Sequence, residues 1–300
     1  MYKLHPDLFS PLKAHAPAEM PLEPLDPFWT IFFKSRLTKL CIAVLGTILL
    51  MALFGPMISG HAFDQANLPL KNSSPSYNFW FGTDDLGRDV FTRVCYGARV
   101  SLLIGFSAAF IDLIIGVTWG ATSAFMGGFY DQISMRVCDI LASLPKLLVV
   151  MILTLVLGSG LFPIILAIAL IGWVPMARII RGEVLSIMQQ DYILSGIAVG
   201  ASYPRLLYRY LIPNVMSVVT VATTMTIPKA IFLEAFLSFL GIGVQAPYAS
   251  WGTMAHEALS GMLYYPWRLI FPALLMSLTI LCFNVIGDAL QETFRLQERQ

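Results

Sequence analysis

The sequence DYILSGIAVGAS at residues 191–202, closed by LIPN at residues 211–214, separates two strongly hydrophobic stretches of the chain. It is too long for a simple turn. Small residues lead up to Gly200, and a basic stretch then runs to Pro213. Asp191 can cap a short helix whose apolar residues share one face. The pattern predicts either an amphipathic helix on the lipid headgroups or a docking helix for a partner outside the membrane.

The composition places most of the chain in a membrane. Of its 300 residues, 57% are hydrophobic and only 12% are charged. A soluble domain carries about 25% charged residues, so this chain cannot cover a soluble surface. Its formal net charge of +1 argues against a nucleic-acid partner. The four Cys and four His are dispersed without zinc-type spacing, so we expect no metal site.

Six stretches are long and apolar enough to cross a bilayer as helices, which takes about 20 residues each. The sequence therefore predicts an all-α, polytopic membrane protein with six transmembrane helices. The predicted spans are 38–58, 99–125, 137–157, 161–180, 214–237 and 268–290. Around them we expect a Pro-rich tail at 1–37, a loop at 59–98 and a second tail at 291–300.

The distribution of positive charge predicts the orientation of these spans. Most of the 19 Lys and Arg residues fall in segments that share a side with the N-terminus. Cytoplasmic segments are enriched in Lys and Arg, so we expect both termini and the 182–213 segment to be cytoplasmic. The 59–98 and 241–267 loops then face outward.

The 191–214 segment resembles the EAA loop of binding-protein-dependent ABC importer permeases. In that family pattern a Glu-Ala-Ala stretch precedes a Gly, and a hydrophobic-Pro ending follows. Gly200 and Pro213 match the Gly and the ending, whereas Leu194, Ser195 and Gly196 replace Glu-Ala-Ala. Without the acidic residue, we expect contact with an ATPase to rest on shape and apolar packing.

A second string, FGTDDLGRDV at residues 81–90, lies just before the second span. From the residues alone, it is a loop rich in Asx turns with an Arg88–Asp ion pair. Together with EAFLSFLGIG at 234–243, it resembles the C-type subunit of di- and oligopeptide importers. WVPMAR at 173–178 favours the oligopeptide members. The motif residues on the outer side are Gly82, Asp84, Gly87, Arg88 and Asp89.

The resemblance implies a type I ABC importer permease fold in the bacterial cytoplasmic (inner) membrane, with permease core 99–290 and a cytoplasmic coupling helix in the EAA loop. Its implied partners are a homologous permease subunit, two ATPase subunits, an extracytoplasmic peptide-binding protein, membrane lipid and the peptide substrate. ATP and Mg would bind the ATPase subunits and no cofactor this chain, which carries no enzyme motif such as Walker A. The implied coupling residues are Leu194, Ser195, Gly196, Gly200, Ala201, Ser202 and Pro213.

Other functions remain open at this point. Relatives in the same family import dipeptides, nickel chelates or antimicrobial peptides. An ion-coupled secondary transporter would need no ATPase.

Charged and hydroxyl side chains inside the predicted spans are the candidates for the transport pathway. Asp112 and Lys229 lie mid-span, where a charge costs about 2.5–3.5 kcal/mol. We hypothesise that they form a buried pair, or alternatively that Lys229 meets a substrate carboxylate. A hydroxyl stripe that includes Thr220 and Thr224 fits either pore lining or helix packing. Glu234 has no obvious partner at helical spacing, and neither does Glu257.

Overall fold

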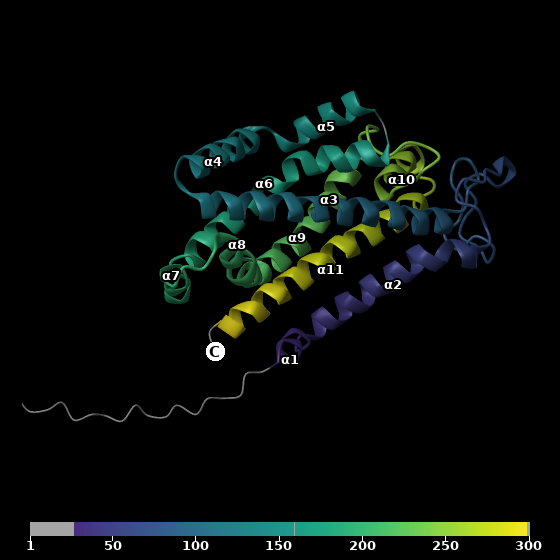
Figure 1. Ribbon diagram of the computed structural model, residues 1–300. Coiled ribbons are helices and arrows are strands. Elements are labelled where there is room, and N and C mark those ends of the chain that lie inside the picture. The colour runs from purple at the N-terminus through teal and green to yellow at the C-terminus, as the bar shows by residue number, and fades with distance from the viewer. Residues whose placement is uncertain (1–26, 159, 299–300) are drawn as a thin grey trace, which may run out of the picture.

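The computed structural model describes residues 27–158 and 160–298, most of which are helical (Figure 1). The long helices are α2 (Arg36–Ser59), α3 (Val90–Met126), α6 (Leu161–Ile187), α9 (Ile212–Phe239) and α11 (Trp267–Glu298). The shorter helices are α1 (Phe28–Phe32), α4 (Gly128–Ser143), α5 (Lys146–Leu157), α7 (Asp191–Ala198), α8 (Tyr203–Leu206) and α10 (Trp251–Ala258). Single helical turns are η2 (Leu68–Leu70), η3 (Leu207–Leu211) and η4 (Leu259–Gly261). Most of the tail predicted for 1–37 lies outside the described residues.

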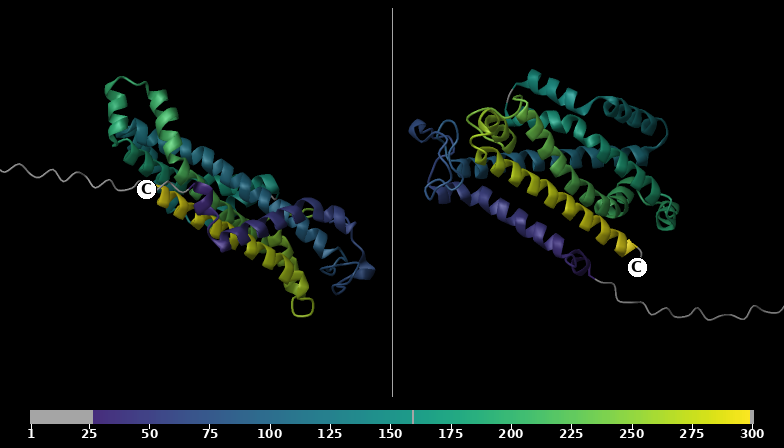
Figure 2. Two further views of the ribbon diagram at one scale, coloured as in Figure 1. Left: turned by 90° about the horizontal axis from the view of Figure 1, so that it is seen from below. Right: turned by 180° about the vertical axis from the view of Figure 1, so that it is seen from behind.

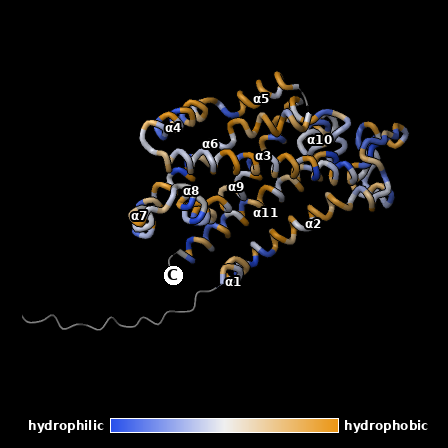
Figure 3. Tube along the Cα trace, viewed as in Figure 1, coloured by the Kyte–Doolittle hydropathy of each residue, from blue (hydrophilic) through white to orange (hydrophobic). Residues whose placement is uncertain are grey.

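The long helices confirm the expected all-α membrane architecture. Within the described ranges, five single helices are long and apolar enough to cross a bilayer, and the bent pair α4–α5 brings the number to six if it counts as one span. Figure 3 shows apolar residues running along these helices, with polar residues gathered toward the ends of the bundle.

The third predicted span, 137–157, is not one straight helix. The chain bends by 85° between α4 and α5. Leu144 has the extended conformation, with φ −77° and ψ 137°, because the residue before a proline avoids the helical region. Pro145 then begins α5 from its N-cap position. The bend therefore follows from the Leu144–Pro145 pair inside an otherwise helical pattern.

Several helices extend beyond their predicted ends. Helix α3 begins at Val90 because the Asp89 carboxylate accepts hydrogen bonds from the N–H groups of Phe91 and Thr92, at 3.3 and 3.0 Å. Helix α6 continues to Ile187, and α11 continues to Glu298 through the range predicted as a tail. Polar residues near helix ends thus extend the helices past the apolar stretches that pattern reading detects.

Helix α3 is the centre of the bundle and packs closely on α6. A Cβ atom placed on Gly120 would lie 2.3 Å from the carbonyl oxygen of Ala177, and one on Gly116 would lie 2.6 Å from the Cβ of Met176. Any residue with a Cβ atom would clash with α6 at either position. Glycine therefore allows the two backbones to touch, as small residues do between membrane helices. Helices α3 and α6 form one interlocked pair.

The two ends of the bundle carry different structures. Helices α7 and α8 lie at one end with α1 and the end of α11, whereas α10 and the 60–89 loop lie at the opposite end (Figure 1). We call these the α7 end and the α10 end. The α7–α8 segment projects beyond the other helices in both views of Figure 2. Each predicted motif outside the membrane therefore lies at an end of the bundle.

Candidate functional site

The α7–α8 segment is anchored to the bundle through a few apolar side chains. Ile193 of α7 is 2% exposed and packs in one cluster with Ile187 of α6 and Leu211 and Val215 near the start of α9. The Asn214 side chain donates hydrogen bonds to the Tyr192 hydroxyl and the Tyr210 carbonyl, at 3.0 and 2.8 Å. Helix α7 is thereby fixed to both α6 and α9.

Gly200 ends α7 in a conformation that favours glycine. Its φ is +85°, in the left-handed region, where a side chain is strained. The N–H of Ala201 donates to the carbonyl of Gly196 at 3.0 Å, which is the long hydrogen bond of a Schellman helix end. A Cβ on Gly200 would meet no atom within 4 Å. Within this chain, Gly200 is needed for backbone geometry rather than for space.

The tip of this segment presents apolar side chains to the outside. Leu194 is 51% exposed and Val199 is 89% exposed. Ser195 is also exposed, and its hydroxyl donates to the Tyr192 carbonyl at 3.0 Å. Gly196 is partly buried, and a Cβ there would make an ordinary 3.6 Å contact with Leu206. The exposed surface of the predicted docking helix is therefore mainly apolar.

The remaining coupling candidates connect this tip to α9. Ala201 is partly buried and Ser202 is exposed between α7 and α8, and the Ser202 carbonyl accepts from the N–H of Leu206 at 3.1 Å. Pro213 lies in the first turn of α9, directly after the π-helical turn η3. Proline suits the first turn because its missing N–H needs no partner there. The segment thus returns directly into a span.

At the α10 end, the two glycines of the 81–90 string shape a tight loop. Gly82 has φ +75° and Gly87 has φ +73°. A Cβ on Gly87 would lie 1.8 Å from the carbonyl oxygen of Asn67, and one on Gly82 would lie 2.6 Å from that of Ser73. Both positions combine a left-handed backbone with close backbone contact, so neither accepts a side chain.

Asp84 organises the loop between these glycines. One carboxylate oxygen accepts from the N–H groups of Leu86 and Arg88, each at 2.9 Å, and the other accepts from Arg88 Nε at 2.6 Å. The predicted Asx turn and Arg88–Asp pair are confirmed. Burial acts to raise the pKa of Asp84, but the charges of Arg93 and Arg88 outweigh it and hold the pKa below its usual value. The two arginines therefore favour the charged form of Asp84.

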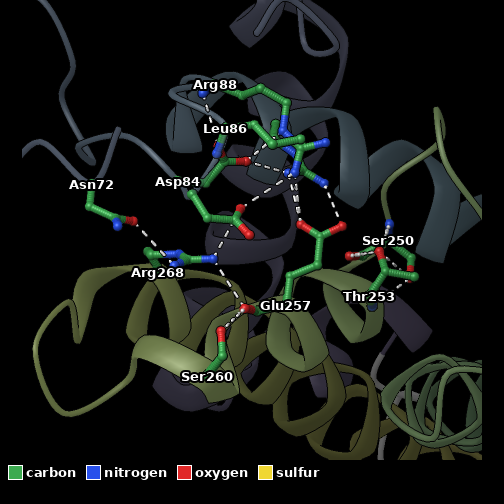
Figure 4. Close-up of polar contacts among 11 residues, drawn as sticks. Asn72, Asp84, Leu86, Arg88, Ser250, Thr253, Glu257, Ser260 and Arg268 are labelled. Carbon is green, nitrogen blue, oxygen red and sulfur yellow. Dashed lines mark hydrogen bonds and ion pairs between the residues drawn. The ribbon is translucent and has the colours of Figure 1, made fainter. Parts of the chain in front are cut away.

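Asp84 belongs to a larger ion cluster that joins the loop to α10 and α11 (Figure 4). Arg93 of α3, only 2% exposed, bonds Asp84 and also donates to both Glu257 oxygens, at 2.9 and 3.2 Å. Arg88 donates to Glu257 at 3.0 Å. Arg268 of α11 donates to the Glu257 carbonyl at 3.0 Å and pairs with Asp85 at 3.2 Å. The loop and the adjoining start of α3 are thus tied by charge to α10 and α11, which are distant in sequence.

The overlap at Gly87 predicts a large loss of stability for Gly87→Ala. We expect Gly87→Ala to lower the unfolding temperature clearly more than Gly60→Ala. Gly60 also has a positive φ, +70°, but a Cβ there meets nothing within 4 Å, so its replacement costs only about 1–2 kcal/mol of backbone strain. Thermal unfolding of the purified protein in detergent measures both. Equal shifts would show that the Asn67 contact does not matter.

Inside the bundle, the hypothesised Asp112–Lys229 pair is not formed. Among the described residues no ion pair joins them within 4.0 Å, and Asp112 Oδ1 has no hydrogen-bond partner. Asp112 is 2% exposed and lies against Gly172 of α6, where a Cβ would come 2.4 Å from its carboxylate. Lys229 is exposed instead.

Glu234 has partners that the sequence reading missed. Its carboxylate is fully buried and accepts from the hydroxyls of Ser238, at 2.7 Å, and Ser101, at 3.1 Å. Ser101 also accepts from the N–H of Trp251 at 3.4 Å. The network therefore connects α3, α9 and α10. Ser238 lies at i+4 from Glu234. Had serine been considered as a partner, helical spacing would have predicted this hydrogen bond.

Thr220 and Thr224 have their hydroxyls satisfied within α9. They donate to the carbonyls of Met216 and Thr220, at 2.7 and 2.8 Å. The Thr224 methyl group lies near Gly287 of α11. This geometry fits the helix-packing interpretation of the hydroxyl stripe better than pore lining.

Comparisons with known proteins relate these features to one family. The sequence pattern described as "Binding-protein-dependent transport system inner membrane component" matches residues 113–296. That of the "N-terminal TM domain of oligopeptide transport permease C" matches residues 24–75.

Several characterised relatives are similar over most of their length. The oligopeptide transport system permease protein OppC of Bacillus subtilis is 49% identical over 261 residues, which is 87% of this chain and 86% of that protein. The dipeptide transport system permease protein DppC of the same organism is 47% identical over 265 residues, 88% and 83% of the two chains. The glutathione transport system permease protein GsiD of Escherichia coli (strain UTI89 / UPEC) is 38% identical over 273 residues, 90% and 89%.

Proposed function

Because this chain belongs to the family of binding-protein-dependent transport system inner membrane components, we propose that it is a membrane subunit of an ATP-driven oligopeptide importer. The observation that carries the proposal is the projecting α7–α8 segment with its exposed apolar tip. Exposed apolar surfaces mark interaction sites, and the projection of this one beyond the other helices (Figure 2) favours a partner outside the membrane over the lipid headgroups. The relatives' names supply the substrate class.

The proposed complex has this subunit beside a homologous permease subunit in the bacterial cytoplasmic membrane. Two ATPase subunits bind at the α7 end, which we place in the cytoplasm with both termini, and hold ATP and Mg. An extracytoplasmic peptide-binding protein docks at the α10 end. This subunit performs no bond chemistry itself. It supplies half of the pathway and the contact through which ATP binding acts.

The proposed mechanism is alternating access. Closure of the ATPase dimer moves the α7–α8 segment through its exposed residues Leu194, Ser195 and Val199. Because Ile193 packs on α6 and α9, the movement passes directly to two spans. Gly200 keeps the tip in the shape that the ATPase contacts, and Pro213 returns the chain to α9.

Co-purification tests this proposal. An affinity-tagged version of this chain, extracted in mild detergent, is expected to retain an ATPase subunit, and the reconstituted complex is expected to import oligopeptides when ATP is present. Uptake driven by an ion gradient without an ATPase would contradict the proposal and support a secondary transporter.

A dipeptide importer is the second candidate, because the dipeptide relative is almost as similar as the oligopeptide relative, at 47% against 49% identity. Competition between dipeptides and longer peptides in the same uptake assay separates the two. If dipeptides alone are imported, the oligopeptide assignment is wrong.

A further inference from the structure

A cavity of about 470 Å³ among the predicted membrane spans carries two lysines. It is lined by α5, α9 and α11, and its polar residues are Lys146, Lys229 and Asn284. Both lysines are exposed to it. In the part of the chain that the structure describes, neither has an ion-pair partner within 4.0 Å. A lysine ammonium at membrane depth is costly unless it meets an anion or water.

The charges around this cavity leave it positive. Lys146 and Lys229 line the same cavity, so their ammonium groups repel each other. The Asp112 carboxylate is buried between α3 and α6, against Gly172, and forms no ion pair with either lysine. The described residues that line the cavity thus supply two ammonium groups and no carboxylate. An anion between the lysines would relieve their repulsion.

The bend between α4 and α5 adds a helix N-terminus to the same cavity. Lys146 is the first residue of α5, and no side chain caps the free N–H groups there. A helix N-terminus carries partial positive charge. In transporters, the N-termini of discontinuous membrane helices point at anionic groups of the substrate. The N-terminus of α5 and the two lysines therefore both favour an anionic ligand.

The lysine cavity and another cavity lie along one face of α9. Val218, Val221 and Met225 line a second cavity of about 420 Å³ toward the α7 end. Pro228, Lys229 and Phe232 line the lysine cavity. These residues follow one another at helical spacing, so both cavities open on the same side of α9. That side also meets α11, through Phe294 in one cavity and Asn284 in the other.

We propose that Lys146 and Lys229 bind the C-terminal carboxylate of the peptide in transit. The inference rests on the proposed function, since it names the group of the peptide that this subunit recognises. The other residues lining the cavity, such as Leu147, Phe232 and Ile280, are apolar and accept varied side chains. A carboxylate is the one anionic group that every unmodified peptide carries, so binding it is compatible with substrates of many sequences.

The experiment compares a peptide acid with the amide of the same peptide, using the whole importer in proteoliposomes. Lys146→Gln and Lys229→Gln are each expected to reduce acid uptake by about tenfold, the loss for one weakened charge pair, and to change amide uptake little. Lys229→Arg is the matched control, and it is expected to retain acid uptake because it keeps the charge. Lys229→Glu is expected to favour the amide. Each variant is compared with wild type for the same peptide. Any preference of the binding protein for the acid or the amide therefore affects both measurements equally.

The outcomes separate this inference from the proposed function. If the wild-type importer moves neither peptide, the proposed function fails. If it moves peptide but the Gln variants lose acid and amide uptake equally, the lysines instead pair with an acidic residue of the second permease subunit, and the inference is wrong. Unchanged uptake of both peptides by the double variant would also overturn it. Thermal unfolding of each variant identifies losses caused by instability.

Discussion

Gly200→Val is expected to reduce peptide uptake by about tenfold or more, whereas Gly200→Asn retains most of it. Gly200 has φ +85°, which a β-branched residue adopts only with strain and asparagine tolerates. The strain is about 1–2 kcal/mol, and each 1.4 kcal/mol is roughly tenfold in an equilibrium. Uptake and ATP hydrolysis are measured together in the reconstituted importer. We expect the valine variant to bind its ATPase poorly and to hydrolyse ATP without matching uptake.

The matched control for Gly200 is Gly196→Ala. A Cβ on Gly196 makes only an ordinary 3.6 Å contact with Leu206, so this variant is expected to unfold at the wild-type temperature. If Gly200→Val transports as well as Gly200→Asn, the shape of the α7–α8 tip does not couple the subunits, and the coupling assignment is wrong.

Arg93→Met is expected to be strongly destabilising, at about 3–5 kcal/mol, because it removes the buried cation of the cluster and leaves Asp84 and Glu257 with Arg88 alone. The Arg93 side chain is 2% exposed and its partner Asp84 is 6% exposed. Arg178→Met removes a similar pair with Asp139, but those side chains are 43% and 58% exposed. An exposed pair contributes about 0.2–1 kcal/mol.

Unfolding of the two variants in the same detergent gives the comparison directly. Arg93→Met is expected to lower the unfolding temperature strongly and Arg178→Met hardly at all. Repeating the measurement at high salt increases the contrast between the two variants, because added salt screens exposed ion pairs more than buried ones. Similar small shifts for both variants would show that the ion cluster does not hold the 60–89 loop in place.

The 81–90 string illustrates how far the sequence predicts a local structure. Glycine, aspartate and arginine at fixed spacing predicted the Asx turn and an Arg88–Asp pair, which the structure forms with Asp84, since these interactions lie within a few residues. Glu257 was missed because its partner Arg93 lies 164 residues away in sequence. Only the packing of α10 beside the start of α3 brings the two together, and no local pattern encodes that packing.

The charged residues inside the bundle show where sequence-based prediction fails. Asp112 and Lys229 have the right depth to pair, yet depth does not specify on which side of a helix a charge lies. Lys146 was not among the pathway candidates, although it lies within the predicted 137–157 span. The Leu144–Pro145 pair carried the signal for the bend, and recognising it would have placed Lys146 at a helix start inside the membrane.

Helix α3 links the two sides of the membrane mechanically. With 37 residues and no internal proline, it is about 55 Å long, whereas the hydrocarbon layer is about 30 Å thick. Near one end it holds the ion cluster through Arg93, and along its length Gly120 locks it to α6, which ends only a few residues before α7. A push on α7 is therefore expected to tilt the whole pair as a rigid body. Opening on one face and closing on the other would then be simultaneous rather than sequential.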